Sequence, residues 1–295
     1  MKTIWIDIAE QITAATGQAF SATSINAVGG GCINQSYHIS DGTRAYFVKL
    51  NHGAHLDMFI AEAKGLNEIH ASRSIRCPRP VCVGTTQGQA HIVMEYIGLG
   101  APQSQSAQML GEQLALMHAK TQSRFGLDHD NTIGSTPQSN SLTAEWVEFW
   151  QNHRLGFQLQ LAAKRGYGGK LQRSGETLLT QLPAFFTDYQ PKPALLHGDL
   201  WSGNAGYDLK GMPVIYDPAL YYGDRECDLA MTELFGGFSS AFYDAYQAAY
   251  PLDPGYQARK TLYNLYHIIN HLNLFGGGYQ SQAQNMIEAL LSQLR

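Results

Sequence analysis

The chain has 295 residues, of which 44% are hydrophobic and 15% are charged. This length allows one large domain or two lobes, and the composition is that of a folded globular protein rather than a disordered one. The formal net charge of -4 provides no broad basic field, which argues against nucleic acid and anionic membranes as main partners and favours small molecules.

The N-terminal segment predicts an amphipathic helix rather than a targeting signal. Ile4, Ile8 and Ile12 recur at helical spacing, and acidic residues interrupt the apolar run that a secretory signal requires. No apolar run reaches the roughly 18 residues of a membrane span, so we expect a cytoplasmic protein. Four cysteines are too few for a disulfide scaffold, and reduced thiols are expected.

Residues 22–97 predict a β-rich unit with one internal helix. Extended segments over residues 22–50, broken by "GGGCINQS" and a "DG" turn, predict an antiparallel meander. A helical pattern follows in "LDMFIAEAKGLNEIHAS", and "PVCVGTT" and "QAHIVMEYI" predict two more strands. No periodic element continues through "GLGAPQSQS", so we place the junction between two lobes near residues 97–104.

Beyond this junction the sequence predicts a mainly helical unit with one short hairpin in "AGYDLKGMPVIYD". The fold class is therefore predicted to be α+β, with a β-rich N-lobe over residues 1–97 and a helical C-lobe over residues 98–295. Helices are expected at residues 105–121, 142–165, 170–188, 226–236, 239–249, 256–275 and 280–294.

The N-lobe contains candidates for phosphate binding. Gly29, Gly30 and Gly31 lie between two strands, where glycine lets backbone N–H groups approach an anion, although three glycines also suit an ordinary loop. The loop lacks the Walker pattern. Lys49 ends the third strand and Glu62 follows on the next helix, so the two would pair if the lysine is buried rather than on the surface.

The segment "HGDLWSGN" and the strand end "PVIYD" supply candidate oxygen ligands. Asp199 is followed by Asn204 and then by Asp217. An aspartate can orient or deprotonate a hydroxyl group, whereas an amide oxygen and a second carboxylate are hard ligands suited to Mg²⁺. Either aspartate alone also fits a polar turn. Together, the three groups would suit phosphoryl transfer.

The order of these parts favours a kinase site. A glycine loop, a strand lysine, a helix glutamate, a D-x-x-x-x-N segment and a strand-terminal aspartate match the phosphate cover, phosphate-binding lysine and its partner, base and metal ligands of a kinase. The connecting segment would offer backbone groups of Glu95 and Ile97 to adenine. We therefore expect ATP and Mg²⁺ to bind between the lobes.

Six segments between about residues 29 and 279 are similar to those of one known family: "GGGCINQSYHI", "YFVKLN", "MFIAEAKGL", "HGDLWSGN", "YDPALYYGDRECDLAMTELFGGF" and "LYHIINHLNLFGGGY". Together they resemble the fructosamine (ketosamine) kinase family, a branch of the protein-kinase-like superfamily that includes aminoglycoside and choline kinases. "HGD" and "DP" are shared by the wider group, whereas "HGDLWSGN" continuing into "PALYYGDRE" is more particular.

The resemblance implies a two-lobed protein-kinase-like fold and ATP-dependent phosphorylation of the 3-hydroxyl of a ketosamine, a sugar joined to an amine by glycation. In that family the product releases the amine, which is a deglycation or repair activity on small molecules or glycated proteins. Carried onto this chain, Asp199 is the base, Asn204 and Asp217 hold Mg²⁺, and Lys49 paired to Glu62 holds the ATP phosphates.

Other polar residues near these motifs have two readings each. Trp201 would pack against a sugar face or alkyl stem, or belong to the core. Asp224, with Glu226 and Asp228, would attract a cationic amine, or form salt bridges within the lobe. Cys32 directly follows the glycines, where its thiolate would be stabilised and its oxidation would lower activity; an inert residue is the alternative.

Two rival functions remain open. One is a kinase of the same fold that acts on choline, an aminoglycoside or a sugar, and the other is a nucleotide-binding pseudokinase that regulates a partner. His267 and His271 lie four residues apart without a third metal ligand, so they are expected to be polar residues of a helix face or of the substrate pocket. The sequence leaves the preferred sugar and the oligomeric state open.

Overall fold

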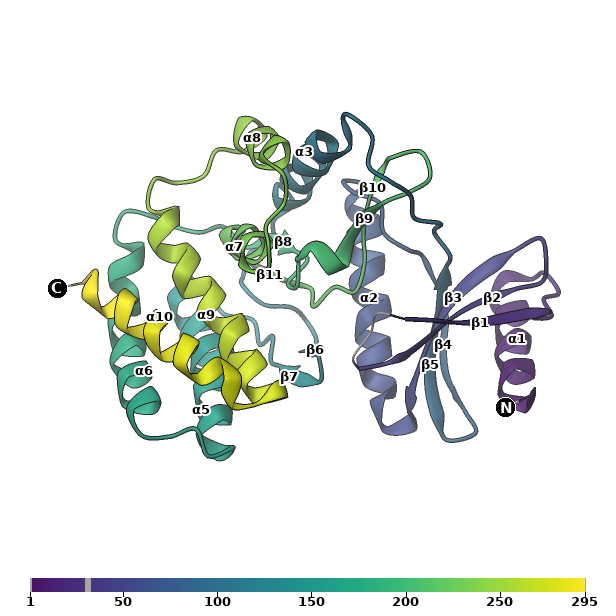
Figure 1. The fold of residues 1–295 in the computed structure, drawn as a ribbon, viewed down its shortest axis with the longest axis horizontal. Coiled ribbons are helices and arrows are strands. Elements are labelled where there is room, and N and C mark those ends of the chain that lie inside the picture. The colour runs from purple at the N-terminus through teal and green to yellow at the C-terminus, as the bar shows by residue number, and fades with distance from the viewer. Residues whose placement is uncertain (1, 30–32, 295) are drawn as a thin grey trace.

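A computed structural model of the chain describes residues 2–29 and 33–294. The first part of the fold is a five-stranded antiparallel sheet (Figure 1). Its strands in chain order are β1 (Ser24–Val28), β2 (Gln35–Ser40), β3 (Ala45–His52), β4 (Pro80–Thr86) and β5 (Gln89–Glu95). Their order across the sheet is β1-β2-β3-β5-β4, and every neighbouring pair is antiparallel. The predicted α+β class is confirmed.

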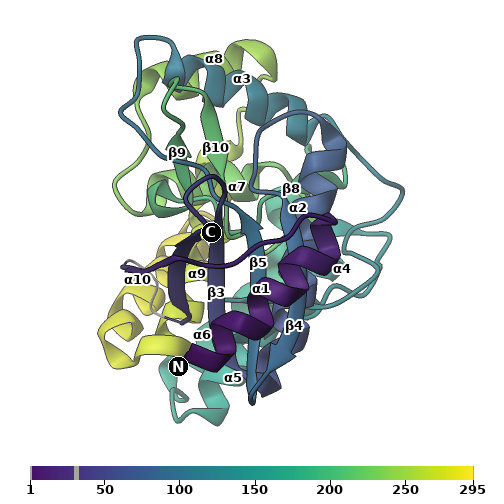
Figure 2. The ribbon, with the colours of Figure 1, turned by 90° about the vertical axis from the view of Figure 1, so that its right-hand side faces the viewer.

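The sheet lies between α1 (Lys2–Thr16) and α2 (Leu56–Ser72). Figure 2 shows α1 crossing the outer face of the sheet, and in Figure 1 α2 lies between the sheet and the rest of the chain. Side chains alternate along β3, so Val48 and Leu50 pack in the core shared with α1. Lys49 lies between them and projects to the opposite face. The α1 core thus supports the strand that carries this lysine.

The second part is mainly helical, as predicted. The helices are α3 (Ser106–His118), α4 (Trp146–Trp150), α5 (Gly156–Lys164), α6 (Lys170–Gln181), α7 (Glu226–Leu234), α8 (Ser240–Ala249), α9 (Tyr256–Phe275) and α10 (Gln280–Ser292), with a π-helical turn at Gln151–Leu155 between α4 and α5. Three antiparallel strand pairs join β6 (Asn131–Ile133) to β7 (Thr136–Gln138), β8 (Ala194–Leu196) to β11 (Tyr221–Gly223), and β9 (Ala205–Tyr207) to β10 (Pro213–Ile215).

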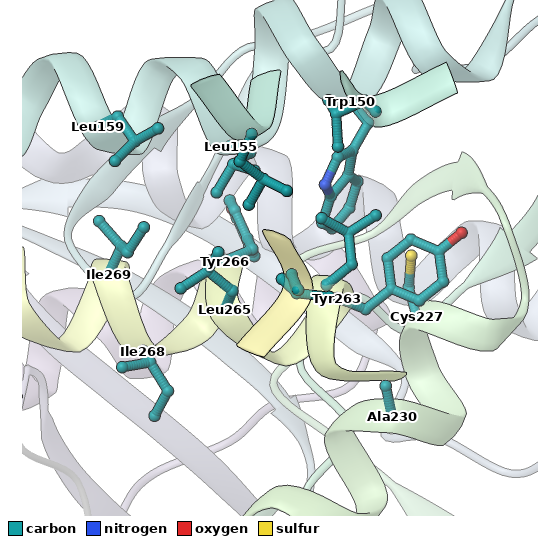
Figure 3. Close-up of a cluster of buried hydrophobic side chains, with 14 of the residues drawn as sticks. Trp150, Leu155, Leu159, Cys227, Ala230, Tyr263, Leu265, Tyr266, Ile268 and Ile269 are labelled. Carbon is teal, nitrogen blue, oxygen red and sulfur yellow. The ribbon is translucent and has the colours of Figure 1, made fainter. Parts of the chain in front are cut away.

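Helix α9 lies at the centre of the hydrophobic core of the helical part. Every residue from Leu262 to Asn270 is buried, which is typical of a helix packed on all sides. The Trp150 ring meets the Tyr263 ring edge to face, with 4.9 Å between centroids (Figure 3). This packing holds the helix that carries His267 and His271.

Arg76 connects the two parts. Its guanidinium lies 2.9 Å from Glu95 at the end of β5 and 2.7 Å from Asp208 in the β9–β10 turn. The backbone N–H of Ile215 donates to the Arg76 carbonyl oxygen at 3.0 Å. Within residues 2–29 and 33–294, no helix is long and apolar enough to cross a membrane. The lobe boundary between residues 97 and 98 stays a prediction.

Candidate active site

A cavity of about 430 Å³ lies between the sheet and the helical part. Lys49 of β3 and Glu62 of α2 line it from one side, and Asp199, Asn204 and Asp217 line it from the other. The structure therefore brings together five residues that are spread over much of the sequence.

Lys49 forms ion pairs with a carboxylate from each side of this cavity. Its Nζ lies 2.7 Å from Glu62 Oε1 and 2.5 Å from Asp217 Oδ1. Burial alone lowers the pKa of Lys49, but the two carboxylates outweigh it, so the pKa is raised and the side chain stays charged. Lys49 is thus a buried cation at the point where the front and back halves of the chain meet.

Asp199 lies in the loop after β8. Burial and, to a smaller extent, the neighbouring Asp217 raise its pKa to about 7. Asn204 Nδ2 donates to the Asp199 carbonyl oxygen at 2.9 Å and to Asp199 Oδ2 at 3.1 Å. The amide nitrogen therefore faces Asp199, and Asn204 Oδ1 is left as an acceptor. A carboxyl group with a pKa near neutrality suits proton transfer.

Asp228 of α7 fixes the start of this loop. Its Oδ2 accepts from the backbone N–H of His197 at 2.7 Å, and its Oδ1 accepts from that of Gly198 at 2.8 Å. His118 of α3 lies 3.1 Å from Oδ2. Asp228 is buried and bonded within the helical part, so of its two interpretations the structure favours a structural role, and the attraction of a substrate amine stays a prediction. Its role as the support of the loop was missed because nothing near it in sequence identifies these partners.

His197 joins the loop to the segment that ends at Asp217. Its Nε2 donates to the Tyr216 carbonyl oxygen at 2.9 Å, so Nδ1 accepts from the Asp199 backbone N–H at 3.3 Å. Gly198 has a φ of +84°, and a Cβ there would lie 2.1 Å from the Ala219 carbonyl oxygen. Glycine is therefore required at this position.

The donor set fits a magnesium ion. Asn204 Oδ1 and the Asp217 carboxylate are hard oxygen ligands on the same cavity wall. Mg²⁺ is commonly held by one or two carboxylates with water and substrate phosphates as the other ligands. The described residues contain no cluster of three or more His, Cys, Asp or Glu side chains suited to a metal.

The end of the cavity away from Lys49 is lined by aromatic side chains. Trp201 lines it, is 38% exposed and packs edge-on against Phe235 at 6.3 Å, so it is not a core residue. His267 and His271 line the same end. Of the two interpretations of these histidines, the structure favours pocket residues.

Asp224 does not line the cavity. It is fully buried, and its carboxylate accepts from the hydroxyl groups of Tyr189 at 2.9 Å and Tyr263 at 2.5 Å. Glu226 is also buried and pairs with Arg259 at 2.7 Å. The expected substrate role of these acids is therefore wrong, because their segment packs into the interior and satisfies their charge there.

The phosphate-loop and redox predictions are only partly covered by the structure. Gly29 is exposed and does not line the cavity. Gly30, Gly31 and Cys32 lie outside the described residues, so their roles stay predictions. The described cysteines, Cys77, Cys82 and Cys227, are free thiols.

The predicted adenine contacts also stay predictions. Glu95 ends β5 at the link between the two parts, and neither it nor Ile97 lines the cavity. The Glu95 carboxylate is engaged by Arg76.

The sheet, the helical part and the cavity between them define a phosphotransferase with a protein-kinase-like fold. Aminoglycoside phosphotransferase APH(4)-Ia, solved with ADP and hygromycin B, shares this fold with a TM-score of 0.61 at 15% identity, over 97% of this chain and 98% of its own. The sequence pattern of the fructosamine kinase family matches residues 4–293. The chain belongs to the fructosamine kinase family.

Individual relatives agree with this assignment. A Synechocystis sp. protein assigned as a ketoamine kinase is 50% identical over 97% of both chains. The chloroplastic protein-ribulosamine 3-kinase of Arabidopsis thaliana is 43% identical over 95% of this chain and 86% of its own. A crystal structure from Haemophilus somnus 129PT, assigned as a fructosamine-3-kinase, has a TM-score of 0.89 at 28% identity, over 98% of this chain and 99% of its own.

Proposed function

We propose that this kinase transfers the γ-phosphoryl group of MgATP to the 3-hydroxyl of a ketosamine, as a deglycation activity in the cytoplasm. The observation that supports the proposal is the 2.5 Å contact between Lys49 Nζ and Asp217 Oδ1 in the cavity that Asp199 also lines; we assign phosphate binding to Lys49 and Mg²⁺ binding to Asp217. Family membership supports the acceptor class. The Arabidopsis relative, named for ribulosamines on proteins, supports glycated proteins as acceptors beside small molecules.

Side chains of this protein supply each group that the reaction needs. Asp199 accepts the proton of the 3-hydroxyl as that oxygen bonds to the γ-phosphorus, the bond from phosphorus to the bridging oxygen breaks, and ADP leaves. Lys49 binds the phosphates, and Asn204 with Asp217 would hold Mg²⁺, which neutralises charge on the phosphate oxygens. The raised pKa of Asp199, caused mainly by burial, suits it to accept a proton near neutral pH.

An acceptor panel tests the proposal. ATP consumption is measured with fructosyl-lysine and ribulosyl-lysine, free and within a peptide, beside choline, an aminoglycoside and fructose. We expect kcat/KM for a ketosamine to exceed that of every other acceptor by about tenfold or more, the range that a specific pocket provides. Preference for one of the others would assign the chain to that rival class. Tight MgATP binding with no turnover of any acceptor would indicate a regulatory pseudokinase.

A further inference from the structure

The His271 ring is enclosed by aromatic side chains from three segments. Its ring centroid lies 5.1 Å from that of Phe235, which follows α7, and 5.5 Å from that of Phe275 at the end of α9. Tyr279, in the single turn Gly277–Tyr279, stacks on it at 5.2 Å. These four residues all line the cavity, and Trp201 connects them to the loop that carries the proposed base. These rings pack around His271 at the aromatic end of the cavity, which we call the acceptor end; the end with Lys49, Asp199 and Asp217 is the phosphoryl-transfer end.

The hydrogen bonding of His271 leaves one nitrogen available to a ligand. Nδ1 lies 2.8 Å from the carbonyl oxygen of His267. A carbonyl oxygen only accepts, so Nδ1 carries the proton and Nε2 of the neutral ring has a lone pair. Burial lowers the pKa of His271, which favours this neutral form. Among the described residues, none forms a hydrogen bond with Nε2, which makes it a free acceptor on a residue that lines the cavity.

The charged side chains of the cavity lie at one of its two ends. Its described lining contains three carboxylates, of which Glu62 and Asp217 are bonded to Lys49 and Asp199 is bonded to Asn204. All three belong to the phosphoryl-transfer end. The acceptor end instead offers the neutral imidazole of His271, whose Nε2 can accept a hydrogen bond from a cationic group.

The acceptor end is also open to solvent. Phe275 is 56% exposed and Trp201 is 38% exposed, although both line the cavity. A group bound at this end can therefore carry a substituent that extends out of the protein. A ketosamine has this shape, because its nitrogen bears both the sugar and the amine's own chain.

We propose that His271 is the residue that recognises the amine of the acceptor. Its Nε2 accepts a hydrogen bond from the ammonium group of the ketosamine, and Phe235, Phe275 and Tyr279 hold the imidazole in place. The inference deepens the proposed function and rests on it. The sugar hydroxyl then reaches Asp199 from the same cavity while the amine's substituent leaves over Phe275.

The test compares a ketosamine with an ether analogue in which oxygen replaces the amine nitrogen. Dissociation constants of both ligands are measured by titration calorimetry with MgADP present, for the wild type and for His271→Phe. The wild type should favour the ketosamine by about tenfold or more, the usual worth of a hydrogen bond to a charged group. In His271→Phe, which keeps a ring but lacks an acceptor, the ratio should fall to about one, because the hydrogen bond that distinguishes the ammonium group from the ether oxygen is lost.

Two further variants make the test selective. His271→Gln places an amide oxygen in the site and should recover part of the preference, which a purely structural role would not produce. His70→Phe, on an exposed position of α2, should keep the wild-type ratio. Equal ratios in the wild type and both His271 variants would overturn the inference while ketosamine turnover by the wild type sustains the proposed function. Absence of that turnover would overturn the proposed function itself.

Discussion

Asp217 combines a proposed metal-binding side chain with an unfavourable backbone conformation. Its φ of 60° is in the left-handed region, which is costly for a residue with a Cβ, and its carboxylate contacts Lys49 at 2.5 Å. Such strain is retained where the conformation serves a site. The sequence placed this aspartate at the end of a strand but could not reveal its conformation, since no glycine or asparagine marks the position.

The strain at Asp217 can be measured by comparing two substitutions. Asp217→Gly and Asp217→Ala both remove the carboxylate, so both should lose turnover. Only glycine adopts the left-handed conformation without cost, so Asp217→Gly should be more stable than Asp217→Ala by about 1 to 2 kcal/mol. The measurement is the free energy of unfolding by urea. Equal stabilities would mean that the backbone at this position is not strained.

Among the elements, the long helices were the easiest to predict. The pattern of residues 256–275 gave a helix with the bounds that α9 has in the structure, because its apolar periodicity is strong. The β6–β7 hairpin was missed, although Asn131, Thr132 and Ile133 line the cavity. Strands of three residues carry too little alternation to be recognised, and the hairpin depends on distant contacts.

One of those contacts comes from the π-helical turn. Arg154 is fully buried there, donates to the Ser139 carbonyl oxygen at 2.6 Å and to Asn140 Oδ1 at 2.7 Å, and lies over the ring of Tyr221. Asn140 Nδ2 in turn donates to Asn131 Oδ1 at 3.0 Å. A local pattern cannot predict a buried arginine with these partners, because they become its neighbours only in the folded chain.

Helix α1 offers a prediction at the element scale. Ile8 is fully buried against the sheet, whereas Ile6 on the same helix is 56% exposed. Ile8→Ala should lower the free energy of unfolding by about 2 to 5 kcal/mol, because it removes buried apolar contacts and leaves a cavity. Ile6→Ala should change it by less than about 0.5 kcal/mol. Denaturant titrations check both, and similar losses in the two variants would refute the packing of α1 on the sheet.

At the scale of the whole molecule, the order of the motifs allowed the central site to be predicted. Lys49, Glu62, Asp199, Asn204 and Asp217 come together because the sheet and the helical part enclose one cavity. The positions of the acidic side chains after Asp217 were harder to predict, because a run of acids does not reveal which side chains face inward.

Nucleotide binding should depend on Lys49, which lies where the sheet meets the helical part. Saturating MgATP should raise the melting temperature of the wild type, and a hundredfold excess over Kd corresponds to about 2.7 kcal/mol of stabilisation. Lys49→Met should show no comparable rise at the same concentration, because the cation for the phosphates is absent. Lys64→Met, on an exposed position of the same helix as Glu62, is the matched control and should behave as the wild type. A full rise in Lys49→Met would show that the nucleotide phosphates bind elsewhere.

The most direct measurement is the effect of Asp199→Asn on kcat with a ketosamine and on the dissociation constant of MgATP. The substitution keeps the shape of the side chain but removes the proton acceptor. The prediction is a loss in kcat of at least about 100-fold, the usual contribution of a general base, with ATP affinity nearly unchanged. Unchanged turnover, or a parallel loss of ATP affinity, would contradict the role of Asp199 as the base of this kinase.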